Sequence, residues 1–475
     1  MDNSTSTIQT TSRGRLFLFY LGGITVSLAL LALLLWVGNR LLGPVGLPQP
    51  PLSESEPLDT LLHLLAALAA VVITARVMGA VFHLFRQPAV IGEVVGGIML
   101  GPSLLGAFYP EAYGFLLPPA TAPYLSVVAQ LGVVLYMFIV GLHLDLSVMR
   151  TSGHATIAIS HASIVVPMLL GVAMAFVLYA PLAGPGAPFA PFALFLGVSL
   201  SVTAFPVLAR ILGDKGLIRT RLGMLALTCA AVDDVTAWCL LAFVVSVSQA
   251  SVAGAFVTFG LTLVYIAVML IVVRPIAGFA IPFLERLGPL NQGGLAVILV
   301  ALLLSALATE FIGIHAIFGA FLLGAVIPHS SKVAEDVTNR LDDLVRVLFL
   351  PAFFAFTGMR TEIGLMASWQ DWAMCAGIIA VATIGKFGGT FLAARVSGLE
   401  RRDSAALGIL MNTRGLVELI VLNIGLDIGV LSPRLFTMLV IMALVTTFMS
   451  GPALNVLMRG HTWNLQPNQE PIRTV

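Results

Sequence analysis

Charged residues are scarce in this chain, and their scarcity excludes an ordinary soluble fold. Only 10% of the 475 residues are charged, whereas 59% are hydrophobic; a typical soluble domain has about 25% charged residues. The runs 151–209 and 235–273 contain no Asp, Glu, Lys or Arg. Such runs require lipid as the solvent, so the sequence predicts a polytopic membrane protein.

Neither sign of charge predominates, and cysteine is rare. The 24 Lys and Arg residues nearly balance the 23 Asp and Glu residues, so no basic surface indicates a nucleic-acid partner. The three cysteines, Cys229, Cys239 and Cys375, lie in apolar stretches without metal-ligand spacing. We interpret them as small buried hydrophobic side chains, and we expect no cofactor.

Apolar segments of about 20 residues, the length that crosses a bilayer, occur throughout the chain. We predict an all-α membrane fold of about 13–14 transmembrane helices. The candidate spans are 15–37, 60–84, 89–106, 122–143, 155–180, 190–212, 222–247, 253–275, 291–309, 312–328, 345–362, 372–394, 404–426 and 433–457. The first is either a cleaved signal peptide or a retained helix; no cleavage site stands out after Val37, so we expect it to be retained.

Lysine and arginine residues concentrate on alternate connections between the predicted helices. Because short loops rich in these residues remain cytoplasmic, we predict a multi-pass protein of a bacterial inner (plasma) membrane with both termini cytoplasmic. The residues behind this prediction are Arg13, Arg15, Arg86, Arg150, Lys215, Arg219, Arg221, Arg286, Lys332, Arg340, Arg346, Arg395, Arg401, Arg402 and Arg459. The opposite loops carry little beyond Arg40 and Arg434.

Two parts of the chain resemble each other. The third predicted helix contains GGIMLGP at 96–102 and the tenth contains GAFLLG at 319–324. The helix that follows each of them ends similarly, with FIVGLHLD at 138–145 and FAFTGMRTE at 354–362. The sequence therefore indicates an internal repeat, unless glycine-rich apolar helices resemble one another by composition alone.

The repeat suggests how the chain is divided. Two blocks of six helices flank a single connecting helix, and an odd connector makes the blocks run in opposite senses through the membrane. Inverted repeats are typical of secondary transporters, whose substrate site lies where discontinuous helices meet. We predict an N-terminal extra helix and loop at 1–58, a first inverted repeat at 59–250, a linker helix at 251–290, a second inverted repeat at 291–458 and a short cytoplasmic tail at 459–475. We expect no soluble domain larger than the 329–344 loop.

Two adjacent acids, Asp233 and Asp234, lie in the middle of the predicted span 222–247. A carboxylate at the bilayer centre costs about 2.5–3.5 kcal/mol on insertion scales, so a buried one indicates function. Eleven residues without an acidic or basic side chain separate the pair from the start of the span, which argues against a solvated helix end. Adjacent helical residues point about 100° apart, so one acid can be held while the other is free.

Lys386 lies mid-span in the twelfth predicted helix and is the expected counter-ion of the acid pair. One lysine and two aspartates leave a formal charge of minus one, which one monovalent cation or one proton would cancel. A metal ion and protons would therefore compete for the same carboxylate. The alternative is that Lys386 extends to the membrane interface.

Two predicted spans contain groups that break a helix. Thr203 and Pro206 lie in the middle of 190–212, where a proline frees backbone carbonyls that can coordinate a cation. The span 404–426 contains Asn412, Arg414, Gly415 and Glu418. We predict that these corresponding spans are discontinuous and cross, with Arg414 and Glu418 neutralising the half-helix dipoles. The alternative is a simple proline kink and an isolated i,i+4 ion pair.

The remaining polar residues of the spans are weaker candidates. Glu93 lies near the start of its predicted helix, where it either lines an entry funnel or is a structural acid. Arg360 and Glu362 lie at a helix end and are interpreted as interface anchors. We assign no role to His143, His154, His161 or His315, although a histidine can sense pH.

Three motifs together resemble the second monovalent cation:proton antiporter family, which includes bacterial sodium/proton antiporters and plant cation/proton exchangers. They are AAVDDVTAW at 230–238, GKFGGT at 385–390 and MNTRGLVELIVLNIG at 411–425. The resemblance covers about residues 60–457. It implies a dimeric, elevator-type antiporter in which Asp234 carries the ion, Asp233 pairs with Lys386, and Thr203 and Pro206 belong to the crossed, unwound helices. The chain departs from similar bacterial members by one extra predicted helix.

The sequence and the resemblance together predict a transporter rather than an enzyme. We expect a homodimer, surrounded by lipid, that exchanges Na⁺ or alternatively K⁺ for H⁺, and that is electrogenic. Carbonyl and carboxylate oxygens suit either ion. A cation channel is one alternative, but a channel often repeats its filter motif and the acid pair occurs in only one block. A transporter-like sensor, which would bind the ion without turnover, is the other.

Overall fold

A computed structural model describes residues 57–458 apart from residues 86, 145–153, 219, 250–251, 287 and 289. Within these ranges the chain is helical, and the only β-type pairing is an isolated bridge between Ala183 and Leu431. The predicted all-α membrane fold is confirmed. The predicted helix at 15–37 and the tail at 459–475 lie outside the described residues.

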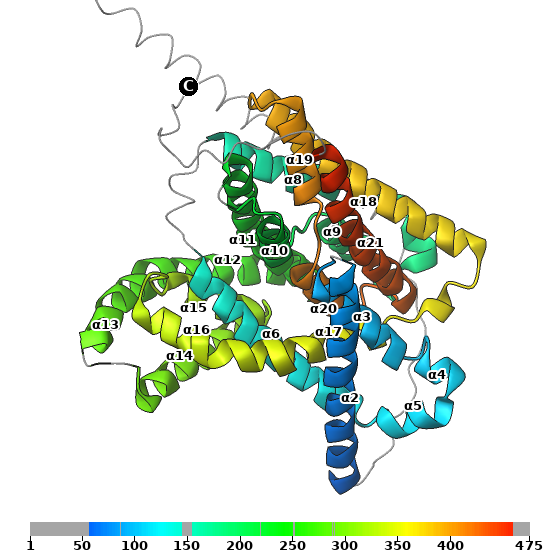
Figure 1. Cartoon of the computed structure of the whole chain (residues 1–475), viewed down its shortest axis with the longest axis horizontal. Coiled ribbons are helices and arrows are strands. Elements are labelled where there is room, and N and C mark those ends of the chain that lie inside the picture. The colour runs from blue at the N-terminus through cyan, green and yellow to red at the C-terminus, as the bar shows by residue number, and fades with distance from the viewer. Residues whose placement is uncertain are drawn as a thin grey trace, which may run out of the picture.

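The helices divide into two groups by their contacts (Figure 1). In what we term the flanking bundle, α6 packs against α15 and α17, and α3 packs against α2 and α17. Its helices are α2 (Pro57–Leu84), α3 (Ala89–Leu100), α4 (Leu105–Phe108), α5 (Pro110–Leu116), α6 (Ala122–His143), α12 (Val252–Val268), α13 (Arg274–Arg286), α14 (Gln292–Ile312), α15 (Ala316–Val326), α16 (Lys332–Leu344) and α17 (Leu350–Met359), with short π-helical or 3₁₀ turns at Met269–Val273, Val345–Phe349 and Ile363–Leu365.

The second group, here termed the site bundle, lies in the upper part of Figure 1. In it α8 packs against α9, α11 and α18, and α18 packs against α19 and α21. Its helices are α8 (His154–Leu182), α9 (Phe189–Ser199), α10 (Phe205–Asp214), α11 (Arg221–Gln249), α18 (Trp369–Val396), α19 (Arg401–Met411), α20 (Leu416–Asp427) and α21 (Pro433–Met458). Each bundle thus draws helices from both predicted repeats.

Nine helices of the described part are long and apolar enough to cross a membrane, and α19 with α20, bent by 44°, makes a tenth candidate. The other predicted spans in that part are divided, shorter or joined to a neighbouring helix. The span 190–212 is divided into α9 and α10, and 312–328 contains α15, of 11 residues. The span 345–362 contains the π-helical turn at Val345–Phe349 and α17, which continue α16 without a break.

Two predicted boundaries were wrong. The linker span 253–275 continues to Arg286, because a π-helical turn at Met269–Val273 leads directly into α13 and accommodates Pro275, which has no N–H to donate. The segment 329–344, predicted as a loop, contains α16. Ser331 caps α16 by accepting a hydrogen bond from the Ala334 N–H, and Val333 and Val337 bury its apolar face.

The repeated glycine motifs meet in two backbone crossings of the flanking bundle. In the α3–α17 crossing, a Cβ on Gly97 would lie 2.3 Å from the Ala355 carbonyl oxygen, and one on Gly358 would lie 2.2 Å from that of Val94. The α6–α15 crossing is similar: a Cβ on Gly141 would lie 2.2 Å from the Phe321 carbonyl oxygen. Only glycine permits this approach of the two backbones. In lipid the hydrophobic effect does not drive helices together, so such close van der Waals packing stabilises their association.

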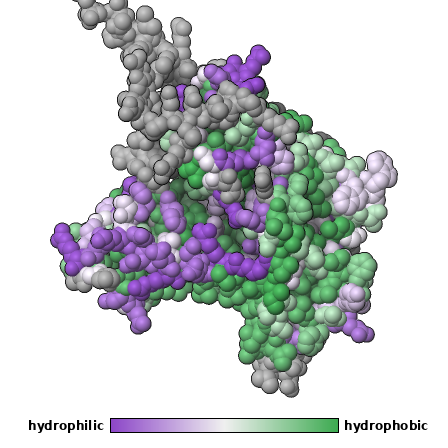
Figure 2. All heavy atoms as spheres, viewed as in Figure 1, coloured by the Kyte–Doolittle hydropathy of each residue, from purple (hydrophilic) through white to green (hydrophobic). Residues whose placement is uncertain are grey.

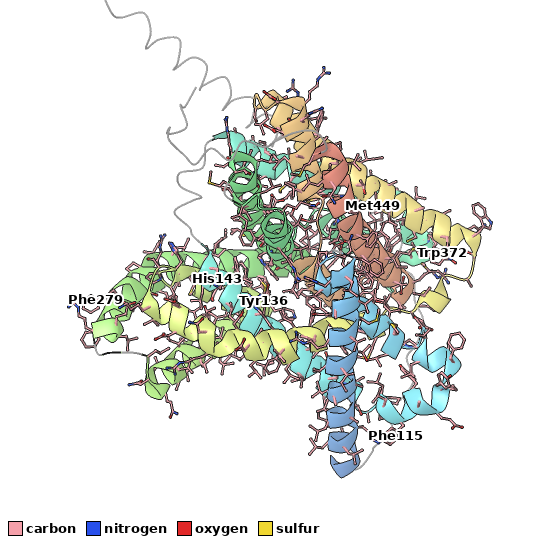
Figure 3. The ribbon with its side chains drawn as sticks, viewed as in Figure 1. Phe115, Tyr136, His143, Phe279, Trp372 and Met449 are labelled. Carbon is pink, nitrogen blue, oxygen red and sulfur yellow. The ribbon has the colours of Figure 1, made fainter. Side chains whose placement is uncertain are left out.

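The outer surface of the chain is apolar over much of the perimeter. Phe279 of α13, Trp372 of α18 and Phe115 of α5 extend outward from separate edges (Figure 3), with 80%, 48% and 60% of their surface exposed. Figure 2 shows hydrophobic residues over α2 and hydrophilic residues gathered over α16. Between the bundles, Trp238 of α11 lies against Phe321 of α15, with ring centroids 6.4 Å apart. The three cysteines are unpaired, and Cys229 and Cys375 are buried as predicted, whereas Cys239 is half-buried.

Candidate ion-binding site

The span that was predicted to break at Pro206 is interrupted between α9 and α10. α9 ends at Ser199, and residues 200–204 lead into α10, where Pro206 is the second residue. Proline is compatible with this position because the first N–H groups of a helix have no intrahelical partner. Because the helix is interrupted, the Ser199, Leu200 and Ser201 carbonyls lack the N–H donors that a following helical turn would supply. Other groups must therefore donate to them.

The span at 404–426 is interrupted at the corresponding place, between α19 and α20. Asn412, Thr413, Arg414 and Gly415 connect the two half-helices. A Cβ on Gly415 would lie 2.7 Å from Val207 Cγ2, so the absence of a side chain there lets this connection approach α10.

The two interruptions cross and bond to each other. The Ala204 N–H donates to the Thr413 carbonyl at 3.0 Å. Thr203 Oγ1 lies 3.3 Å from the Met411 carbonyl oxygen. The structure therefore brings Thr203 and Pro206 together with the polar residues of the second broken span.

Arg414 is buried at this crossing and satisfies the freed carbonyls of α9. Its Nη1 donates to the Ser199 carbonyl and its Nη2 to the Leu200 carbonyl, each at 2.7 Å. Nη1 also lies 3.3 Å from Glu418 Oε2. Arg414 thus sits at the negative C-terminal end of α9 and Glu418 in the first turn of α20, where opposite charge offsets each helix dipole. The alternative of an isolated i,i+4 pair is wrong.

Asp233 of α11 accepts hydrogen bonds on both carboxylate oxygens and is 1% exposed. Oδ2 accepts from Ser163 Oγ at 2.7 Å, from Thr203 Oγ1 at 2.7 Å and from Lys386 Nζ at 3.1 Å. Oδ1 accepts from Ser160 Oγ at 2.5 Å. These donors come from α8, from the interruption after α9 and from α18, so Asp233 joins three parts of the site bundle.

Asp234 differs from its neighbour although both are buried. It is 3% exposed, and its Oδ1 has no hydrogen-bond partner among the described residues. A buried carboxylate oxygen without a donor is costly, and such atoms are rare in native structures. Asp233 is therefore held while Asp234 keeps an oxygen free, which is the division of the pair that the helical spacing predicts.

Lys386 of α18 is fully buried, so the alternative that it extends to the membrane interface is wrong. Its Nζ donates to Asp233 Oδ2 at 3.1 Å and also to the Ser201 carbonyl at the interruption after α9. One lysine thereby connects the acid pair to the broken helix.

Of two other predicted residues, one lies at the crossing and the other lies in the flanking bundle. Asn412 belongs to the second interruption, is 6% exposed, and has no partner for its Oδ1 among the described residues. Glu93 of α3 belongs to the flanking bundle, within electrostatic range of Arg76 and Arg210. No hydrogen bond between Glu93 and the aspartates is present among the described contacts.

The histidines of the described spans differ in whether Nδ1 has a hydrogen-bond partner. The Nδ1 atoms of His143 and His161 each lie 2.9 Å from the carbonyl oxygen four residues earlier. In contrast, Nδ1 of the buried His315 has no hydrogen-bond partner in the described structure.

Sequence reasoning missed Ser160 and Ser163, which supply two of the four donors to Asp233. Their i,i+3 spacing places them on one face of α8, and this was the available signal. It is weak, because serine is common in apolar helices.

Arg360, interpreted from the sequence as an interface anchor, has specific partners on a neighbouring helix. From the end of α17 it donates to Asn423 Oδ1 at 3.0 Å and to Asp427 Oδ1 at 2.5 Å on α20. Asn423 Nδ2 in turn donates to Thr357 Oγ1 at 2.8 Å. We call Arg360, Asn423, Asp427 and Thr357 the polar latch; it joins the flanking bundle to the site bundle and borders a small pocket that His315 also lines.

Residues 67–460 match the family profile described as "Sodium/hydrogen exchanger, transmembrane". The chain belongs to this family. The resemblance inferred from the three sequence motifs is therefore confirmed.

Individual relatives of the exchanger family extend the match. The chain is 43% identical over 396 residues to the Na(+)/H(+) antiporter NhaS4 of Synechocystis, covering 83% of this chain and 97% of that protein. It is 39% identical to cation/H(+) antiporter 17 of Arabidopsis thaliana, over 85% of this chain and 48% of that protein. It is 33% identical to K(+)/H(+) antiporter 1 of Saccharomyces cerevisiae, over 77% and 42% of the two chains. The chain thus spans about half the length of these plant and yeast relatives.

Among solved structures, the sodium proton antiporter MjNhaP1 of Methanocaldococcus jannaschii has the same fold. The TM-score is 0.59 with 13% sequence identity, and the match covers 84% of this chain and 99% of that one.

Proposed function

We propose that this protein is a secondary active antiporter that exchanges a monovalent cation for protons across a membrane. The observation that carries the proposal is the unpartnered Oδ1 of Asp234 beside the fully bonded Asp233. In this proposal Asp234 binds either the cation or a proton, never both, and this competition couples the two fluxes. The amide oxygen of Asn412, also without a partner, is a candidate second ligand.

Electrogenic exchange requires a second proton in each cycle. The Asp233–Lys386 ion pair contains the remaining protonatable groups that are in direct contact at the site. We propose that Lys386 gives up this second proton when the cation enters and regains it when the cation leaves. One positive charge then crosses per cycle in excess of the cation.

An elevator motion is the proposed form of alternating access. Every side chain that bonds to Asp233 belongs to the site bundle, so the site can move as one unit. The contacts with the flanking bundle include the Trp238–Phe321 ring contact and the polar latch. These are separable because the ring contact is non-directional and the latch contains few groups.

Sodium is the proposed cation, with potassium as the alternative. NhaS4, the relative matched over nearly its full length, is a Na⁺/H⁺ antiporter, whereas the yeast relative is a K⁺/H⁺ antiporter. The oxygen ligands available here suit both ions. We further propose a homodimer in a bacterial inner membrane with both termini cytoplasmic.

The test uses purified protein in liposomes with an imposed proton gradient. Lumenal pH is followed as sodium, potassium or lithium is added, with and without a potassium–valinomycin voltage clamp. The proposal predicts pH changes that follow one cation and respond to voltage. Cation flux that neither requires nor moves protons would instead identify a channel, and cation binding without any flux would identify a sensor.

A further inference from the structure

The two oxygens of Asp233 are held from different elements. Oδ2 has three donors, from Lys386, Thr203 and Ser163. Oδ1 has a single donor among the described residues, the hydroxyl of Ser160 on α8, at 2.5 Å. The state of Oδ1 therefore depends on one side chain.

The Ser160 hydroxyl is committed to this contact in a way that is unusual for a helical serine. Hydroxyls within helices commonly donate to the carbonyl four residues earlier, as Ser246 of α11 does to the Ala242 carbonyl at 2.7 Å. The Ser160 hydroxyl instead has Asp233 as its only described hydrogen-bond partner, and the side chain is fully buried. Ser163 is less committed, because its single hydroxyl hydrogen is shared between Asp233 Oδ2 at 2.7 Å and the Ser160 carbonyl at 2.8 Å.

Without Ser160 the site would contain two unpartnered carboxylate oxygens, one on each aspartate. A buried carboxylate that lacks donors is neutralised by taking up a proton. A proton on Asp233 would remove the ionic partner of Lys386 and would oppose cation binding at the adjacent Asp234.

We propose that Ser160 is a positioning residue that holds Asp233 as a carboxylate throughout the cycle, so that Asp234 is the only acid of the pair that exchanges its proton for the cation. This proposal rests on the exchange function proposed above. It leaves Lys386 as the carrier of the second proton.

The other titratable groups near Asp233 do not take over this role. Cys229 of the same helix directs its Sγ at the Thr156 carbonyl, 3.7 Å away, and the described contacts include no hydrogen bond between Asp234 and Asp233. Lys386 of α18 bonds only Oδ2. Arg414 of the connection between α19 and α20 is engaged with the Ser199 and Leu200 carbonyls and with Glu418.

The experiment compares wild type, Ser160→Ala and the control Ser246→Ala in the full chain reconstituted into liposomes. The cation KM and the maximal exchange rate are measured separately from acidic to alkaline pH. Loss of a hydrogen bond to a charged group typically changes an equilibrium by about tenfold or more. We therefore expect Ser160→Ala to raise the cation KM roughly tenfold at acidic and neutral pH and to move the pH profile upward by about one unit, because a proton on Asp233 must leave first. At alkaline pH both the KM and the maximal rate should return to the wild-type values.

A second pair of variants covers the case in which Ser160→Ala fails to fold. Ser160→Thr and Ser160→Val have nearly the same volume and differ in the hydroxyl, so only the valine variant should show the shifted profile. A lowered rate at every pH with an unshifted profile, or equal profiles for Thr and Val, would overturn the positioning role while leaving the exchange function intact. Absence of exchange in the wild-type protein would overturn both.

Discussion

Removing the positive charge of Lys386 should destabilise the buried site. Lys386→Met keeps much of the side-chain volume but leaves Asp233 Oδ2 without its cation and the Ser201 carbonyl without a donor. Removing one partner of a buried ion pair typically costs 3–5 kcal/mol. Three hydroxyls, those of Ser160, Ser163 and Thr203, remain on Asp233. Hydrogen bonds to charged groups contribute about 1.5–3 kcal/mol each, so these hydroxyls partly stabilise the remaining carboxylate. We therefore expect Lys386→Met to lower the free energy of unfolding by about 3 kcal/mol, the lower end of the range for a broken ion pair.

The double variant Lys386→Met/Asp233→Asn separates the charge from the packing. Because it removes both members of the pair, it should recover much of the stability that the single variant loses. Thermal stability in detergent, followed by size-exclusion chromatography, measures this difference.

The same single variant has a functional consequence in liposomes. Exchange should persist but lose its voltage dependence, since the proposed second proton carrier is absent. Voltage-dependent exchange at the wild-type ratio of protons to cations would exclude Lys386 from the coupling mechanism. A double variant no more stable than Lys386→Met would refute the reasoning about the buried pair.

The remaining predictions concern the crossings and the contact between the bundles. Gly358→Ala should destabilise the protein by about 1–3 kcal/mol, because a Cβ there would lie 2.2 Å from the Val94 carbonyl oxygen. The control Gly278→Ala, where a Cβ would have no neighbour within 4 Å, should be neutral or slightly stabilising. Equal melting temperatures for the two variants would contradict the close-packing argument. Arg360→Ala should remove two of the three bonds of the polar latch and leave the one between Asn423 and Thr357. It should increase the reactivity of a cysteine placed at Ile424, which lines the adjoining pocket, toward a membrane-impermeant thiol reagent, measured in a background with the native cysteines replaced. Unchanged reactivity relative to Arg434→Ala, whose arginine pairs with Asp371 instead, would show that the latch does not hold the bundles together.

Much of the membrane fold could be predicted from sequence because hydropathy and charge are local properties. The broken spans were also predictable, since Pro206 and the polar segment around Gly415 disrupt helices wherever they occur. Span lengths were less predictable: α15 is shorter than its apolar run, whereas the helix that contains α17 begins at Lys332, inside the segment predicted as a loop. The division into two bundles could not be read from the sequence, because each combines helices from both halves of the chain.

Within the site, charge was informative and hydroxyl groups were not. Asp233, Asp234 and Lys386 are conspicuous because a charged residue in an apolar span is expensive. Ser160 donates to a residue 73 positions away, and Arg360 to one 67 positions away. Such pairings depend on how helices pack, so a side chain that is inexpensive to bury gives little sign of them.

The most direct test of the account is the exchange activity of Asp234→Asn in voltage-clamped liposomes, with Glu335→Gln on the exposed face of α16 as the matched control. The substitution keeps the volume of the side chain and removes the carboxylate proposed to bind the cation and the proton in turn. We expect Asp234→Asn to be folded, inserted and inactive at every pH and cation concentration, while Glu335→Gln exchanges at the wild-type rate. Cation-coupled proton movement by Asp234→Asn would contradict the central claim.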